Sequence, residues 1–101
     1  MTPEEAANAF IRLGCQEDRR HSRKNYRWLE LLDDEGRQIA IFNIPTSKSP
    51  LRKGTLVNGI LNPNGIRDEN HLAELLADAD PPAAFRRVLP QGGPRYRPRG
   101  A

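Results

Sequence analysis

Residues 25–44 read NYRWLELLDDEGRQIAIFNI, and this stretch decides the fold. Polar and apolar side chains alternate on both sides of residues 33–36, which read DDEG. Alternation with a period of two is typical of a β-strand, and a four-residue loop that ends in glycine is typical of a hairpin. We therefore predict two antiparallel strands over residues 25–32 and 38–44, joined by a loop in which Gly36 takes the left-handed conformation.

Both faces of this hairpin carry apolar side chains. In the first strand, one face would hold Tyr26, Trp28, Glu30 and Leu32 and the other Arg27, Leu29 and Leu31. In the second strand, one face would hold Ile39, Ile41 and Asn43 and the other Ala40, Phe42 and Ile44. Because neither face is purely polar, we expect helices to cover one of them. The other face would meet a partner chain or stay partly exposed.

The residues before the hairpin predict a helix and a short strand. Thr2, Pro3 and Glu5 have the pattern of a capping box with proline in the first turn. Gly14 follows the last residue of an apolar stripe with helical spacing, where a helix would end with positive φ. We predict a helix over residues 3–13 and an edge strand over residues 15–20.

The residues after the hairpin predict two further helices. Pro45 would end the second strand, and Thr55 is a natural N-cap for a short apolar helix. Asp68 would cap a third helix over residues 69–78, whose leucines recur at helical spacing. Residues 1–79 would then form an α+β domain in the order α-β-β-β-α, with this third helix as an addition at the C-terminal end.

Residues 80–101 differ in composition from the rest of the chain. They contain five of the nine prolines and five arginines against one aspartate, whereas residues 1–79 contain eleven basic and twelve acidic residues. Their local apolar residues are limited to the cluster Phe85, Val88 and Leu89, which alone does not offset the entropy of ordering the segment. We expect a Pro- and Arg-rich tail that is disordered or docks on a partner.

Bulk composition excludes several classes of protein. A chain of 101 residues supports one small domain, and the single cysteine, Cys15, cannot form an intrachain disulfide. No apolar run approaches the ~20 residues of a membrane span, so we expect a cytoplasmic protein without membrane contact. We also expect neither a metal nor a cofactor, because the acidic residues 33–35 are consecutive and Glu69, His71 and Glu74 lack a second histidine nearby.

The chain approaching the hairpin is strongly basic. Arg19, Arg20, Arg23, Lys24 and Arg27 fall within nine residues, with His21 among them and Trp28 directly after. Cations next to flat rings suit a surface that meets a polyanion, and RNA is the partner we expect. The alternative is a solvated, charged strand edge with its aromatic residues packed inward.

A second basic group precedes the short helix near residue 55. Lys48, Arg52 and Lys53 lie in the loop that leads to Thr55. A helix N-terminus attracts phosphate, so the two basic groups could form one binding surface. The alternative is that these are ordinary solvated loop charges.

The order of elements and one short motif resemble the HicA-type toxins. The motif is Lys53-Gly54-Thr55-Leu56 at the start of a helix after a basic loop, and Ser22 and Tyr26 match the start of the family's second strand. The resemblance covers roughly residues 5–66. It implies a double-stranded-RNA-binding-like fold, messenger RNA cleavage, and neutralisation by an antitoxin partner.

The sequence departs from the family at the catalytic position. HicA-type proteins carry a histidine where this chain has Arg23, so the family's catalytic role does not transfer to that position. His21 lies two residues away, where it would project to the same side of an extended strand, and we name it as the candidate general base for the ribose 2′-OH. The alternative is a catalytically inactive module that binds RNA or docks on a larger assembly through its sheet face and basic tail.

Overall fold

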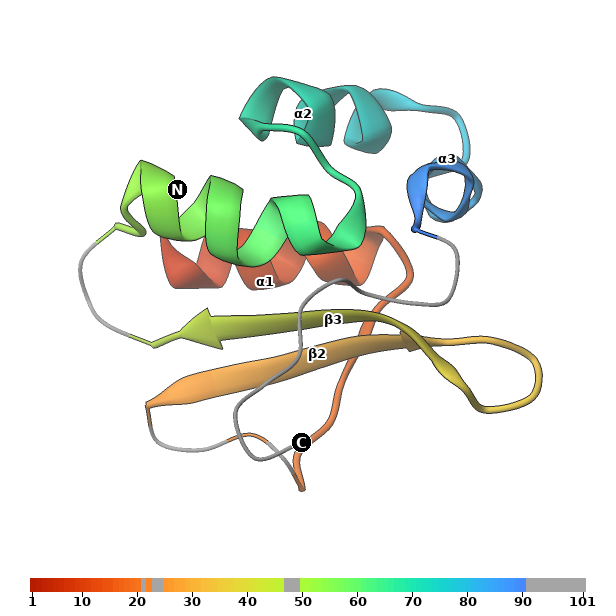
Figure 1. Ribbon diagram of the computed structural model, residues 1–101, viewed down its shortest axis with the longest axis horizontal. Helices are drawn as coiled ribbons and strands as arrows, with labels where there is room; N and C mark the ends of the chain where they lie inside the picture. Colours follow the sequence, from red (N-terminus) through yellow and green to blue (C-terminus); the bar gives the residue numbers. More distant parts are fainter. Residues whose placement is uncertain (21, 23–24, 47–49, 91–101) are drawn as a thin grey trace.

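The computed structural model describes residues 1–20, 22, 25–46 and 50–90. It confirms the α+β class, with one antiparallel sheet in the strand order β1-β2-β3 and the helices gathered on one side of that sheet (Figure 1). The elements are α1 (Pro3–Arg12), β1 (Gln16–Glu17), β2 (Tyr26–Leu32), β3 (Gln38–Pro45), η1 (Thr55–Leu61), η2 (Asn62–Asn64), α2 (Glu69–Ala77) and α3 (Pro81–Val88).

The first helix begins with the predicted cap. The Thr2 hydroxyl accepts a hydrogen bond from the Glu5 N–H, and the Thr2 N–H donates to the Glu5 carboxylate at 2.9 Å. These two bonds satisfy backbone groups that the first helical turn leaves open. Gly14 follows the helix with φ of 101°, which confirms its role as the residue that ends it.

The hairpin forms as the alternation predicts, with one local exception. Gly36 has φ of 78°, and Leu29 lies opposite Phe42 on the buried face. The pairing shifts between Leu31 and Leu32, so that Ile39 becomes the extra residue of a bulge and packs against the core. The predicted face of Ile39 is therefore wrong, because a bulged residue leaves the period of two.

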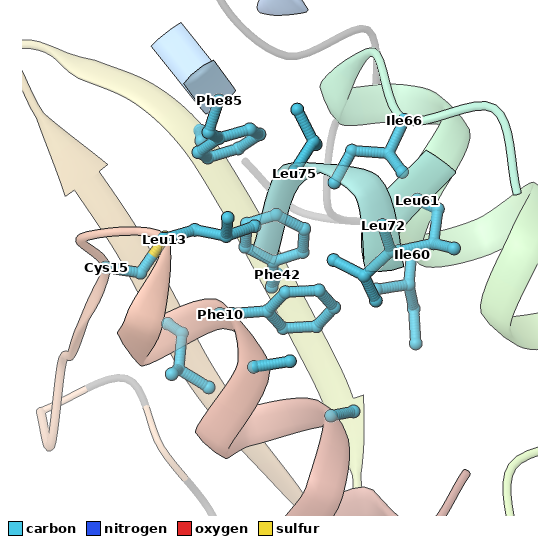
Figure 2. Packing of buried hydrophobic residues seen from close by; sticks show 14 of the residues in the cluster. Phe10, Leu13, Cys15, Phe42, Ile60, Leu61, Ile66, Leu72, Leu75 and Phe85 are labelled. Carbon is cyan, nitrogen blue, oxygen red and sulfur yellow. The ribbon is translucent and has the colours of Figure 1, made fainter. Parts of the chain in front are cut away.

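The main core lies between the sheet and the helices. The rings of Phe10 and Phe42 stack with centroids 3.8 Å apart, and Phe85 approaches Phe42 at 5.8 Å. Figure 2 shows Leu72 and Leu75 of α2 on the same side of these rings as the aliphatic residues of η1. The helices α1, η1, α2 and α3 therefore contribute to one continuous apolar cluster.

The strand β1 is shorter than the predicted residues 15–20. After Glu17 the chain turns, and the Asp18 N–H donates to the Trp28 carbonyl at 2.8 Å. The Trp28 N–H donates to the Ser22 hydroxyl at 3.0 Å rather than to a backbone carbonyl. A side chain thus takes the place of the next ladder bond, and β1 ends at two residues.

The helix η1 begins before the predicted cap. The Leu56 N–H donates to the Arg52 carbonyl at 2.9 Å, and Gly54 already has helical φ and ψ of −62° and −42°. Thr55 lies inside the helix, so its predicted N-cap role is wrong. The apolar residues Leu56, Ile60 and Leu61 of this helix are buried.

The helix α2 begins at the predicted cap, whereas α3 replaces part of the expected tail. The Asp68 carboxylate accepts from the His71 N–H at 2.8 Å, and Asp80 caps α3 by accepting from the Ala83 N–H at 3.2 Å. Phe85 is fully buried. The domain therefore continues past residue 79, because burial of Phe85 in the common core supplies the free energy that offsets the ordering of this segment. Residues 91–101 lie outside the described residues.

A buried asparagine closes the free edge of β3. Asn64 accepts from the Ile41 N–H at 2.9 Å, and its amide donates to the carbonyls of Ile41 at 2.7 Å and Ile60 at 3.0 Å. Asn64 has no exposed surface. Its amide therefore supplies the two hydrogen bonds that a further strand would give Ile41, and it fixes η2 against the sheet.

Candidate nucleic-acid interface

The structure describes five of the nine residues named from the sequence. Arg19 and Arg20 are exposed on the connection between β1 and β2, and Arg52, Lys53 and Thr55 are exposed at the start of η1. The other candidates, His21, Arg23, Lys24 and Lys48, lie outside the described residues.

The two basic connections meet at one end of the sheet. Tyr26 lies opposite Pro45, and the Thr46 N–H donates to the Asn25 carbonyl at 3.0 Å. The segment at Leu51 also reaches this end of the molecule, since its N–H donates to the Met1 carbonyl at 2.8 Å. The end of one connection therefore touches the start of the other.

The described cations of the two connections nevertheless stand apart. Figure 1 shows the connection that carries Arg19 and Arg20 on the side of β2 away from the helices. The helix η1, which begins directly after the segment carrying Arg52 and Lys53, lies on the helix side of the sheet (Figure 1). A ligand that touches both groups must therefore extend across the end of the sheet.

The connection between β1 and β2 is held by a set of polar side chains. Arg27 donates to one Glu17 carboxylate oxygen through Nη2 at 2.7 Å and Nε at 3.1 Å. Ser22 Oγ lies 3.0 Å from the other Glu17 oxygen. The hydrogen bond from Arg27, joined by that from Ser22, lowers the pKa of Glu17 against the opposing effect of burial. The charge of Arg27 is therefore compensated within the fold.

Acidic side chains border the second basic group. A groove of about 330 Å³ beside Lys53 is lined by Lys53, Val57, Asp68, Glu69 and Asn70. The Asp68 carboxylate caps α2, so its position is fixed by the helix. A polyanion at Lys53 would approach from the loop side, because the carboxylates of α2 repel it on the other.

Two further titratable side chains of the described residues, Cys15 and His71, lie outside the basic groups. Cys15 is buried, and burial, with a smaller effect of the Glu30 charge, raises the pKa of its thiol to about 12. The thiol is therefore neutral at physiological pH. His71 accepts from the Arg67 N–H at 3.0 Å through Nδ1.

The described residues provide neither a metal-binding cluster nor a membrane-spanning helix. Within residues 1–20, 22, 25–46 and 50–90, no three His, Cys, Asp or Glu side chains stand where they could hold a metal ion. The helices of these residues are also too short or too polar to cross a bilayer.

Comparisons of the chain with protein-family models, with curated proteins and with solved structures found no match.

Two structural residues escaped the reasoning from sequence. Glu17 was not expected to pair with Arg27, although the two side chains lie on neighbouring strands and have opposite charge. Nothing in the sequence adjacent to Asn64 indicates that its amide reaches Ile41. The first could have been found from strand pairing, whereas the second needs the tertiary fold.

Proposed function

We propose that this chain is a HicA-like protein that binds RNA through a double-stranded-RNA-binding-like fold. Its support is the order α1-β1-β2-β3-η1, with an antiparallel sheet of consecutive strands and both helices on one face of that sheet. In folds of this kind, the segment before the second helix faces the phosphates of the RNA. That segment carries Arg52 and Lys53 here.

The observation that carries the proposal is the exposure of cations at the start of η1. Arg52, Lys53 and Thr55 are all exposed. Among the described residues, neither Arg52 nor Lys53 takes part in an ion pair. Their charges are therefore available to phosphate, whereas the charge of Arg27 is not.

Cleavage of the bound RNA would follow the chemistry of the ribose 2′-OH. A base takes the proton of that hydroxyl, and its oxygen bonds to the adjacent phosphorus while cations stabilise the charge that develops on the phosphate. The bond from phosphorus to the 5′-oxygen of the next nucleotide breaks, and that oxygen takes up a proton, which leaves a 2′,3′-cyclic phosphate and a 5′-hydroxyl. His21 is our candidate for the base, with Arg19 and Arg20 as candidate cations. On this proposal the chain is a messenger-RNA-cleaving toxin that an antitoxin neutralises.

A catalytically inactive module is the second candidate function. Ser22, which matches the serine of the family motif, is held within the fold by bonds to Trp28 and Glu17. Arg23 stands at the family's catalytic position. These two features favour a protein that binds RNA, or docks on a larger assembly, without cutting it.

Loss of the cations before η1 should weaken RNA binding. We expect the Arg52→Gln, Lys53→Gln double variant to bind a 20-nucleotide RNA hairpin about tenfold more weakly near physiological salt. The slope of log Kd against log salt should fall by about 1.8, which is the contribution of two phosphate contacts to a duplex. Fluorescence anisotropy over a range of salt concentrations measures both quantities.

The matched control is the Arg86→Gln, Arg87→Gln variant, which loses the same charge from exposed positions on α3. It should change the dissociation constant by less than about twofold, since these residues lie away from the proposed surface. Equal weakening by both double variants would show that only net charge matters, and would remove the proposed surface.

Cleavage is tested with the same RNA. If wild-type protein cuts it and His21→Ala does not, the toxin reading holds. Full cutting by His21→Ala would remove His21 from the mechanism. Binding without cutting by wild-type protein would select the inactive module.

A further inference from the structure

We propose that Glu17 is a positioning residue, whose carboxylate holds the connection between β1 and β2 so that Arg19 and Arg20 face bound RNA. This inference rests on the proposed RNA binding. It assigns a role to an acidic residue in a surface that would otherwise be interpreted through its cations alone.

The two oxygens of the Glu17 carboxylate join different parts of the chain. One oxygen accepts from Arg27 of β2 at 2.7 and 3.1 Å, and the other lies 3.0 Å from the hydroxyl of Ser22. Ser22 belongs to the connection, while Arg27 belongs to the strand that follows it. The carboxylate is therefore a bridge between the connection and the sheet.

Backbone bonds complete the closure of this connection. The Ser22 N–H donates to the Asp18 carbonyl at 3.0 Å, and the Asp18 N–H donates to the Trp28 carbonyl at 2.8 Å. The Trp28 N–H in turn donates a hydrogen bond to the Ser22 hydroxyl at 3.0 Å. Arg19 and Arg20 thus lie between Asp18 and Ser22, which both form a hydrogen bond with the backbone of Trp28.

The backbone of Arg20 is also held by a hydrogen bond of its own. Its backbone N–H donates to the Asp18 carboxylate at 3.0 Å, and its Nε lies 3.7 Å from the same carboxylate oxygen, while its side chain is 91% exposed. Asp18 therefore holds both the backbone and the base of the guanidinium, and the rest of the side chain faces solvent. This is the arrangement that presents a cation to a phosphate without first ordering the loop.

The sign of the effect separates positioning from simple electrostatics. The Arg19 charge is close enough to contribute to the lowered pKa of Glu17, so the carboxylate reduces the local positive potential. Removing that negative charge should strengthen attraction to RNA if charge alone matters. If Glu17 positions the connection, its removal should instead weaken binding.

Two variants of Glu17 carry the test. We expect Glu17→Ala to bind a 20-nucleotide RNA hairpin about threefold to tenfold more weakly, the size of one or two phosphate contacts. Glu17→Gln should retain most of the wild-type affinity. Its amide oxygen can accept from Arg27, and its amide nitrogen can donate to the Ser22 hydroxyl, although the side chain carries no charge. The control Asp34→Ala makes the same change in net charge at an exposed hairpin residue, and it should not weaken binding.

Trypsin gives a readout that does not depend on RNA. Mass spectrometry should detect fragments ending at Arg19 or Arg20 several times faster in Glu17→Ala than in Asp34→Ala. Thermal unfolding should differ little between these variants, since a partly exposed ion pair contributes little to stability.

The outcomes are distinct. Tighter binding by both Glu17 variants, or unchanged cutting at Arg19 and Arg20, would overturn the positioning role. If wild-type protein does not bind the RNA, the proposed function fails, and the trypsin rates still decide whether Glu17 holds the connection.

Discussion

Replacing Phe85 with alanine should lower the free energy of unfolding by about 3–5 kcal/mol. The Phe85 ring is fully buried and lies 5.8 Å from the ring of Phe42, so its loss leaves a cavity at the centre of the apolar cluster. A domain of this size has a total stability of about 5–15 kcal/mol, so the change is a large part of it. Urea unfolding followed by circular dichroism measures the effect.

Two further variants keep this test informative. Phe85→Leu should cost less than the alanine variant, which gives a measurable transition if Phe85→Ala does not fold. Arg86→Ala alters an exposed neighbour on the same helix and should stay within about 0.5 kcal/mol of wild type. Wild-type stability in Phe85→Ala would mean that α3 is not part of the folded domain.

Replacing Asn64 with leucine should cost about 3 kcal/mol of stability. The change removes all three hydrogen bonds of the Asn64 side chain and leaves the N–H and carbonyl of Ile41 without partners at a buried position. Each unsatisfied buried group costs about 1–3 kcal/mol. The opened edge of β3 should also promote association between chains, which light scattering detects.

The control for this variant is Asn58→Leu on the exposed side of η1. It makes the same chemical change and should alter stability by less than about 0.5 kcal/mol. Equal effects of the two substitutions would show that the leucine itself, rather than the lost edge bonds, is responsible.

Local signals predicted the elements whose stability is decided locally. The capping box of Thr2 and Glu5, the Asp68 cap and the positive φ of Gly36 all form as the sequence indicates. Each depends on residues no more than four positions apart, so the sequence pattern contains the whole interaction.

Apart from the cap of η1 and the bulge at Ile39, the errors concern elements that depend on distant residues. Phe85 gains its stability from Phe42, and Asn64 from Ile41, which are separated from them by many positions. β1 is short because Ser22 takes a bonding position on β2, and a hydroxyl in a basic stretch gives no sign of that role. Residues 80–90 were predicted to lie outside the domain because the prediction rested on their composition, which does not show the contact between Phe85 and Phe42.

The candidate interface was predictable only as a set of charges. Exposure of Arg19, Arg20, Arg52 and Lys53 agrees with the expectation from the basic pattern. The pattern could not show that Arg27 would be compensated by Glu17, because that pairing follows from the register of β1 with β2. The distinction matters, since the charge of Arg27 is already neutralised by a close ion pair within the fold and is less available to a phosphate.

The most direct measurement is an NMR titration of ¹⁵N-labelled protein with a short RNA hairpin. Binding at the proposed surface should shift the amide signals of residues 18–26 and 50–57, while those of α3 remain in place. No shifts at these residues, or shifts confined to α3, would contradict RNA binding through the end of the sheet where the two basic connections meet.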